Sequence, residues 1–360
     1  MNHCIRKIDS RTTPLCWLPD GKLVCYKEGF VKVYNKGEVV LHIPVFSKKK
    51  EHILAKSKML YRGMRMGVRA SIALNGSIVL LSKGSYIYEL SLTTRVLSKG
   101  FFLGNGVRPL IYSEVNNVEG FDSGIYFGGY LSNNNKNSVN IYKRISEDNW
   151  EVIYTFSNGS INHVHNIVVD SFRNCLWIFT GDFDDASAIW KVTDNFRKVE
   201  RVVCNNQKYR GCVAYALPEG LLYATDAPFA DDFIYLMNTD TFELKEILPI
   251  HGSCIYGCQW KDKYVFSSTV EGDGRNMSRW EFLFGRKRGA GIKDDYVHMY
   301  IGNLKEGFKE IYKEKKDCMP FYTFQFGVFK FPYGINNGDV LYFQPVATKI
   351  NDQGLMAYSE

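Results

Sequence analysis

We predict an all-β fold for this chain, a β-propeller of seven four-stranded blades, from three observations. An apolar residue followed by an aromatic one recurs along the chain, at Val33-Tyr34, Ile87-Tyr88, Ile141-Tyr142, Ile189-Trp190, Ile234-Tyr235, Met299-Tyr300 and Ala357-Tyr358. Three copies are followed by similar turns, whose aspartates at positions 148, 194 and 240 lie 46 residues apart both times. Aromatic residues make up 15% of the chain, which suits strands packed between neighbouring sheets. A repeat of about 40–50 residues is the length of one propeller blade.

Each blade should begin with an inner strand that lines a central channel. Seven segments are small or apolar and end in a turn, as such strands require: 14–18, 68–74, 107–112, 163–169, 210–216, 254–260 and 324–329. We therefore expect one domain over residues 1–360, with blades near 11–45, 60–100, 105–157, 161–204, 208–249, 252–315 and 321–360. Six or eight blades are the alternatives to this count of seven.

The last blade lacks a fourth strand, because only 324–329, 340–343 and 355–358 read as strands before the chain ends. Residues 3–8 read as a spare strand ahead of the first blade. We expect residues 1–10 to pair with the last blade and close the ring, since closure removes two exposed sheet edges.

Composition bounds the environment and the partners. Nine cysteines, an odd number, lie mostly inside apolar strand patterns, which favours free thiols and a cytoplasmic location. No apolar run of about 18 residues occurs, so neither export nor membrane insertion is expected. The net charge of +7 is concentrated in the runs 48–50, 286–288 and 313–316. Such runs are typical of solvated loops, and without a nucleic-acid motif we expect no nucleic-acid partner.

Arginines stand where small or apolar residues are expected, at the starts of three inner strands. They are Arg69, Arg108 and Arg210, each from a different blade. Three guanidinium groups aimed at one axis would repel one another unless an anion lay between them, and a carboxylate is their natural bidentate ligand. The alternative is that each arginine pairs with a nearby Asp or Glu, or lies on the outer rim.

Two histidines share one face of an inner strand, because side chains in a strand alternate with a period of two. His163 and His165 are followed one strand later by Asp182, within Gly181-Asp182-Phe183-Asp184-Asp185. This set suits proton transfer or substrate binding, and a divalent metal is the less favoured use because His-x-His is common in strands. We expect no cofactor. The alternative is a histidine hydrogen-bonded across the channel and an aspartate cluster that caps a turn.

Tyr256 and Glu271 occupy the mouth ends of the sixth blade, and Asp226 has the corresponding position in the fifth. A Glu beside a Tyr can accept the phenol proton and make the oxygen a nucleophile or base. Asp226 is a candidate acid or hydrogen-bonding partner. The alternative for Tyr256 is packing, since the chain holds 23 tyrosines.

The turns at 146–150 and 193–196 resemble degenerate copies of the Asp-box of sialidase-like β-propellers, Ser/Thr-x-Asp-x-Gly-x-x-Trp. The stretches 163–170 and 176–182 are similar to blades of that superfamily, so the resemblance covers blades three to five. It implies that Arg69, Arg108 and Arg210 grip a sugar carboxylate and that Tyr256 with Glu271 attacks the anomeric carbon.

Propeller-fold polysaccharide lyases are a second precedent. They neutralise a uronic-acid carboxylate with Arg or His and remove the α-proton with Tyr or His, which Arg108, Arg210, His163 or His165, and Tyr256 would serve equally well. Both precedents share an acidic carbohydrate as partner, so we expect a carbohydrate-active propeller that acts by glycosidic hydrolysis or by elimination. The non-catalytic alternative is a glycan- or protein-binding scaffold, whose conspicuous residues would lie on the outer rim.

Overall fold

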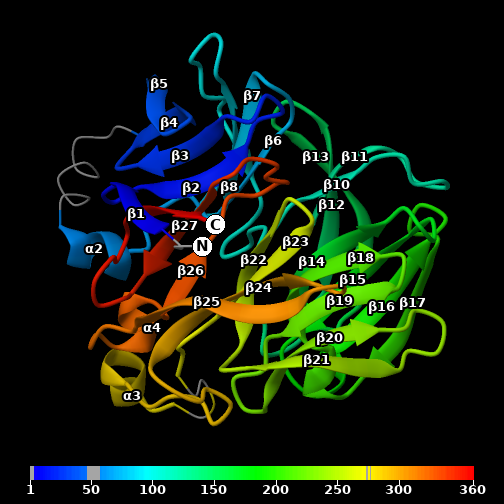
Figure 1. Ribbon diagram of the computed structural model, residues 1–360. Coiled ribbons are helices and arrows are strands. Elements are labelled where there is room, and N and C mark those ends of the chain that lie inside the picture. The colour runs from blue at the N-terminus through cyan, green and yellow to red at the C-terminus, as the bar shows by residue number, and fades with distance from the viewer. Residues whose placement is uncertain (1–3, 47–56, 273–274, 276) are drawn as a thin grey trace.

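The computed structural model describes residues 4–46, 57–272, 275 and 277–360 and confirms the predicted fold class. Seven four-stranded antiparallel sheets are arranged around a central axis, and chain colour passes around the ring from blue to red (Figure 1). The inner strands of the seven blades, in chain order, are β2 (Thr13–Trp17), β6 (Ala70–Ala73), β10 (Ser113–Val115), β14 (His163–Asp170), β18 (Gly211–Leu217), β22 (Cys254–Trp260) and β26 (Val328–Lys330).

Each inner strand is followed outward by further antiparallel strands. The second strands are β3 (Leu23–Lys27), β7 (Ile78–Lys83), β11 (Gly124–Gly128), β15 (Cys175–Gly181), β19 (Gly220–Thr225), β23 (Lys263–Ser268) and β27 (Leu341–Val346). The third are β4 (Phe30–Asn35), β8 (Tyr86–Ser91), β12 (Val139–Ser146), β16 (Ala188–Thr193), β20 (Asp232–Met237), β24 (Tyr296–Asn303) and β28 (Leu355–Ser359). The outer strands of blades one to six are β5 (Glu38–Pro44), β9 (Phe101–Phe102), β13 (Asn149–Phe156), β17 (Lys198–Cys204), β21 (Leu244–Ile250) and β25 (Gly307–Lys315).

The N-terminal strand closes the ring, as the sequence predicts. β1 (Cys4–Asp9) is the outer strand of the seventh blade and pairs antiparallel with β28, with Cys4 opposite Ser359. Blue and red chain therefore lie side by side in Figure 1. His3, at the start of the predicted strand, lies outside the described residues.

The repeated apolar–aromatic pair has one structural role. Every copy lies in the third strand of its blade, from Val33-Tyr34 in β4 to Ala357-Tyr358 in β28. In blades one, three, four, five and six the register against the outer strand shifts between the two residues of the pair. Because a bulge bends a strand and increases its twist, the repeat marks where each sheet twists toward its outer edge.

The core is divided among the contacts between blades. An apolar cluster joins each neighbouring pair of sheets, including the contact of the seventh with the first, where Leu23 and Tyr34 pack near Tyr342 and Leu355. Trp177, in β15, is completely buried, and its indole nitrogen donates to the buried carboxylate of Asp170 at 2.9 Å. Apolar contacts between sheets thus hold the inner strands at fixed positions around the channel.

Helices are confined to connections. Among the described residues they are α2 (Lys58–Gly63), α3 (Arg279–Phe284), α4 (Phe321–Phe324) and the short 3₁₀ turns η1 (Asp184–Ala186) and η2 (Gln207–Tyr209). In the described part of the chain, no helix has the length and apolar character needed to cross a bilayer. The basic run at 48–50 lies outside the described residues.

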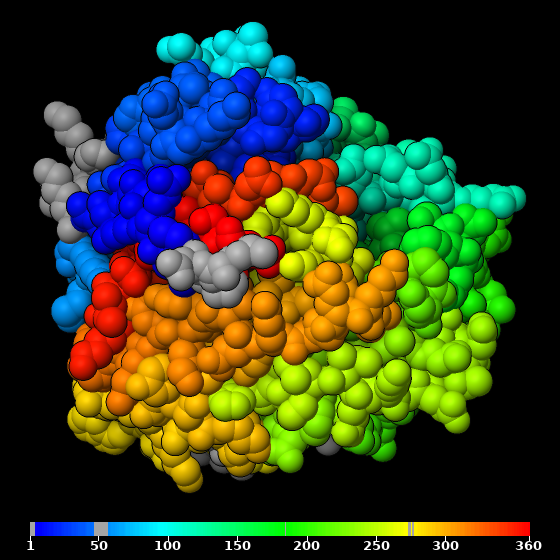
Figure 2. Space-filling model, in the orientation of Figure 1, coloured from blue at the N-terminus to red at the C-terminus, as the bar shows by residue number. Residues whose placement is uncertain are grey.

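A segment of the last blade crosses one end of the channel. Residues 331–340 join β26 to β27, and the Tyr333 backbone exchanges hydrogen bonds with Leu15 and Trp17 of the first blade. On the other side the amide of Lys261 in the sixth blade donates to the carbonyl of Asn336 at 2.7 Å. Orange-red atoms accordingly lie between the blue and yellow surfaces in Figure 2. Tyr333 lines the central cavity, so that cavity is bounded at this end by the segment.

Candidate functional site

A cavity of about 130 Å³ lies on the channel axis and is lined by inner strands from several blades. Arg69, Cys212, Tyr256 and Lys330 belong to its wall, together with Asn166. The strands β6, β10, β14 and β18 begin at the same mouth, because all inner strands of a propeller run in one direction along the axis. The polar residues at strand starts therefore gather at that mouth, in a cationic group and an acidic group.

The cationic group consists of Arg65, Arg69, Arg108 and Lys330. Arg69 directly precedes β6, Arg65 lies four residues earlier, and Lys330 ends β26. Arg65, Arg69 and Lys330 line one small pocket. Burial lowers the pKa of Arg69 to about 10, and the positive charge of Arg108 contributes to this shift. Burial and the three arginines lower the pKa of Lys330 to about 7. In the described chain none of these four side chains forms an ion pair with a carboxylate.

Two tyrosines accompany the cations. Arg108 and Tyr130 exchange backbone hydrogen bonds, and the Arg108 guanidinium lies 4.7 Å from the centre of the Tyr130 ring. Lys330 Nζ lies 5.7 Å from the centre of the Tyr256 ring. Burial raises the pKa of Tyr256, and the positive charges of Arg69 and Arg108 offset only part of that rise. Tyr256 thus stays a phenol at neutral pH, in a cationic surrounding.

Arg210 does not join the other two predicted arginines. Its Nη2 lies 3.1 Å from Asp182 Oδ1, and its Nε lies 3.3 Å from Asp226 Oδ2. This is the alternative that the sequence left open, in which an arginine pairs with nearby carboxylates. The reason is the chain path, since the peptide of Asp226 bonds back to the Arg210 carbonyl at 2.9 Å and so places the carboxylate beside the guanidinium.

The predicted pairing of Tyr256 with Glu271 is also absent. Glu271 Oε1 accepts a hydrogen bond from Thr269 Oγ1 at 2.8 Å, and its carboxyl contributes to the field at Arg210. Within the described chain no hydrogen bond joins Glu271 to Tyr256. Tyr256 lies with the cationic group and Glu271 with the acidic group, so Glu271 is not placed to accept the Tyr256 proton.

The acidic group holds carboxyls in different protonation states. Burial would raise the pKa of Asp182, but Arg210 and His163 outweigh it and hold that pKa well below its usual range. Burial raises the pKa of Asp226 to about 7, although Arg210 opposes the rise. Burial likewise raises the pKa of Glu271. Asp182 is therefore a carboxylate at neutral pH, whereas Asp226 can carry a proton.

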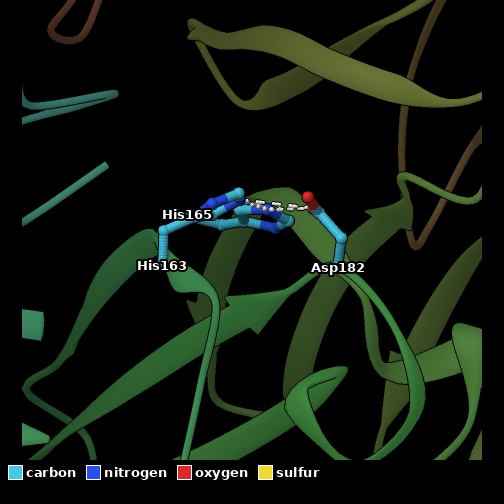
Figure 3. A group of neighbouring side chains, drawn as sticks. All are labelled: His163, His165 and Asp182. Carbon is cyan, nitrogen blue, oxygen red and sulfur yellow. Dashed lines mark hydrogen bonds and ion pairs between the residues drawn. The ribbon is translucent and has the colours of Figure 1, made fainter. Parts of the chain in front are cut away.

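His163 and His165 lie on one face of β14, as predicted, with their rings side by side and aimed at Asp182 (Figure 3). Their Nε2 atoms are 3.0 Å apart, and each lies 3.2 Å from Asp182 Oδ1. His163 Nδ1 is 2.9 Å from the carbonyl oxygen of Leu131. Burial lowers the pKa of His165 to about 4, so this imidazole is neutral. The Tyr130 ring lies 4.3 Å from the His163 ring and joins the two groups.

Sequence reasoning missed Arg65, Lys330 and Tyr130. Lys330 had a detectable signal, because it directly follows the predicted inner strand 324–329, where a charged residue is unexpected. Arg65 and Tyr130 had no comparable signal, since each lies outside an inner strand and reaches the mouth only through the path of a connection.

Comparisons with known proteins support the architecture. No protein-family model matches the chain, and no curated protein sequence matches it. Among solved structures, it is similar to a chain of a mitotic checkpoint complex, with 12% identity and a TM-score of 0.55 over 99% of this chain and 91% of that one. It is also similar to the Cps50 (Swd1) β-propeller domain of Myceliophteria thermophila, with 10% identity and a TM-score of 0.52 over 99% and 100%.

A third similar structure is a prolyl endopeptidase, with 11% identity and a TM-score of 0.53 over 94% of this chain and 46% of that one. Identities this low show the fold alone and give no support to a sialidase-like family. The chain is a seven-bladed β-propeller with a charge-separated mouth.

Proposed function

We propose that the channel mouth binds an acidic carbohydrate through its carboxylate, held by Arg65, Arg69, Arg108 and Lys330. The observation that carries this proposal is the gathering of four cations from blades two, three and seven without a carboxylate partner in the described chain. Partly buried like charges repel one another, so the close approach of these cations is unfavourable by itself. A bidentate carboxylate would relieve that repulsion and match the guanidinium fork.

The surrounding residues suit a sugar better than a bare inorganic anion. Tyr256 and Tyr130 place aromatic faces beside the cations, and such faces pack against apolar surfaces of a ligand. Asp226 supplies a hydrogen-bonding carboxyl across the mouth. An interior location also argues against the scaffold alternative, whose binding residues would lie on the outer rim.

Elimination fits these residues better than hydrolysis, because Tyr256 lacks the Glu271 contact that a nucleophilic phenol needs. In the proposed step the arginines neutralise a uronate carboxylate, and a base takes the proton α to it. The C4–O bond then breaks, a C4=C5 double bond forms, and an acid protonates the leaving oxygen. The Tyr256 phenol, which burial keeps protonated, is assigned as the acid.

The test measures binding and products separately on a panel of uronate-containing oligosaccharides. Calorimetry is expected to show binding of acidic but not of matched neutral oligosaccharides. Elimination would release new reducing ends together with the ultraviolet absorbance of the double bond, whereas hydrolysis would release reducing ends alone. Binding without turnover would assign the non-catalytic alternative. Equal binding of neutral and acidic sugars, or binding of neither, would contradict the proposal.

The affinity for an acidic sugar should fall as pH rises above about 7, because Lys330 loses its charge there. The sign follows from linkage: an anion favours protonated Lys330, so binding takes up a proton and weakens as protons become scarce. Lys330→Met should bind more weakly at pH 6 and lose this dependence, with Lys263→Met as the control lysine. An equally steep pH dependence in Lys330→Met would rule out Lys330 as its source.

A further inference from the structure

We propose that His163, His165 and Asp182 bind a divalent transition-metal ion of the zinc class, at a site separate from the carboxylate-binding cations. The three candidate ligand atoms form a nearly equilateral triangle, with sides of 3.0, 3.2 and 3.2 Å (Figure 3). In tetrahedral zinc sites with bonds of about 2.0–2.2 Å, neighbouring ligand atoms lie about 3.3–3.5 Å apart. A small expansion of the triangle therefore accommodates the ion and leaves a fourth position for water.

Hydrogen bonds alone do not account for this triangle. His163 Nδ1 faces the Leu131 carbonyl oxygen at 2.9 Å, so it carries a proton, and in the neutral ring Nε2 then holds a lone pair. If His165 Nε2 carries a proton, it can donate to His163 Nε2 or to Asp182 Oδ1. The lone pair of His163 Nε2 then still faces the carboxylate oxygen of Asp182, which is unfavourable. If both Nε2 atoms carry protons, two N–H groups face each other. A cation at the centre makes all three contacts favourable.

The surroundings of the triangle resemble those of metal sites. The Leu131 carbonyl orients the His163 ring as carbonyls orient metal-binding histidines, and Arg210 holds Asp182 by Nη2 at 3.1 Å. A carboxylate oxygen has lone pairs for both an N–H donor and an ion. His163 and His165 are 4% and 2% exposed, so both imidazoles are shielded from solvent.

A second histidine cluster provides the contrast. His251, Asp294 and His298 also lie close together, on the sixth blade. There His298 Nδ1 faces Glu310 and His298 Nε2 faces Asp294, so a doubly protonated imidazole between two carboxylates satisfies both contacts. No arrangement of protons satisfies all three contacts among His163, His165 and Asp182 in the same way, and we therefore assign the ion to that triangle.

The test starts from protein stripped with a chelator and titrated with Zn²⁺, with Co²⁺ and Mn²⁺ as further probes. Calorimetry and elemental analysis should give one zinc per chain, and zinc should raise the melting temperature of wild type. Asp182→Asn and His163→Gln should each weaken zinc binding at least about tenfold, the lower end of what losing an outer-shell partner costs. The matched control is His251→Gln, which should bind as wild type does.

A readout on wild type avoids dependence on the folding of the variants. With histidine-selective ¹⁵N labelling, zinc should shift the Nε2 resonances of His163 and His165 and leave those of His251 and His298 unchanged. No zinc binding by wild type, or zinc lost in His251→Gln but retained in Asp182→Asn, would overturn the proposal. Because these measurements use no sugar, failure here leaves the carboxylate proposal to its own test.

Discussion

Arg108→Gln is expected to weaken binding of an acidic sugar about 10- to 150-fold, while leaving the fold intact or making it more stable. A hydrogen bond to a charged group contributes about 1.5–3 kcal/mol, which corresponds to that range of affinity. Stability should not fall, because without ligand Arg108 faces Arg69 and other positive charges rather than a carboxylate. Calorimetric titration gives the affinity, and thermal unfolding without ligand gives the stability.

The combination of weaker binding and undiminished stability separates a ligand-binding arginine from a structural one. Arg197→Gln is the matched control, since its side chain is 80% exposed and should affect neither quantity. Arg69→Gln should behave as Arg108→Gln does. If Arg108→Gln bound the sugar as tightly as wild type does, the cationic group would not be the carboxylate site.

Arg210→Met should destabilise the protein by about 3–5 kcal/mol at pH 7, because it leaves buried carboxylates without their cation. Arg210 is 8% exposed and faces both Asp182 and Asp226, so solvent screens the loss only weakly. Urea unfolding at pH 7 measures the change. Arg210→Lys is the control, since it keeps the charge but loses the planar fork, and it should cost less.

The pH dependence of this effect has a defined sign. In wild type the pKa of Asp182 is held below its unfolded value near 3.9, so its contribution to stability is present above pH 4 and is lost as pH falls through the folded pKa. Without Arg210 that pKa should rise, and protonation should restore part of the stability between pH 7 and 5. A loss within 1 kcal/mol at pH 7, typical of exposed pairs, would contradict the buried network.

Asp226 contributes in the opposite direction in wild type. Its folded pKa, about 7, lies above the unfolded value, so the folded state holds a proton that the unfolded state releases near pH 4. Its contribution to stability is present below pH 4 and is lost as pH rises toward 7. The stability of Arg210→Met and Arg210→Lys between pH 5 and 7 therefore reflects the titration of Asp182 and Asp226 together.

Local pattern was enough to predict most of the strands and their order. It was wrong for the inner strand of the third blade, predicted at 107–112 and found at β10, so Arg108 precedes that strand instead of starting it. It also placed the start of the last inner strand, predicted at 324–329, too early, because α4 ends at Phe324 and β26 begins at Val328. The apolar–aromatic pairs, such as Ile189-Trp190, mark the third strands because a bulge there recurs with the blade, and a recurring feature is visible without any long-range contact. The closing strand β1 followed from counting strands, because an unpaired edge at 355–358 needed a partner. The same-face placement of His163 and His165 followed from the two-residue period of a strand.

The sequence did not predict which side chains pair with one another across the mouth. Arg210 read as a third ligand-binding arginine, yet the path of the chain after β19 places Asp226 beside it. Glu271 read as the partner of Tyr256, yet it lies with the acidic group. Lys330 completes the cationic group. It comes from the seventh blade, for which the sequence predicted no site residue.

The amino-acid sequence by itself determined the class of fold, the repeat and the closure of the ring. These depend on period, composition and strand count, which are properties of neighbours along the chain. Only the tertiary structure decided which charges meet, because side chains from seven blades face one axis and their partners depend on loop paths and on the turn of each sheet. The separation of the mouth into a cationic and an acidic side is a property of the closed ring.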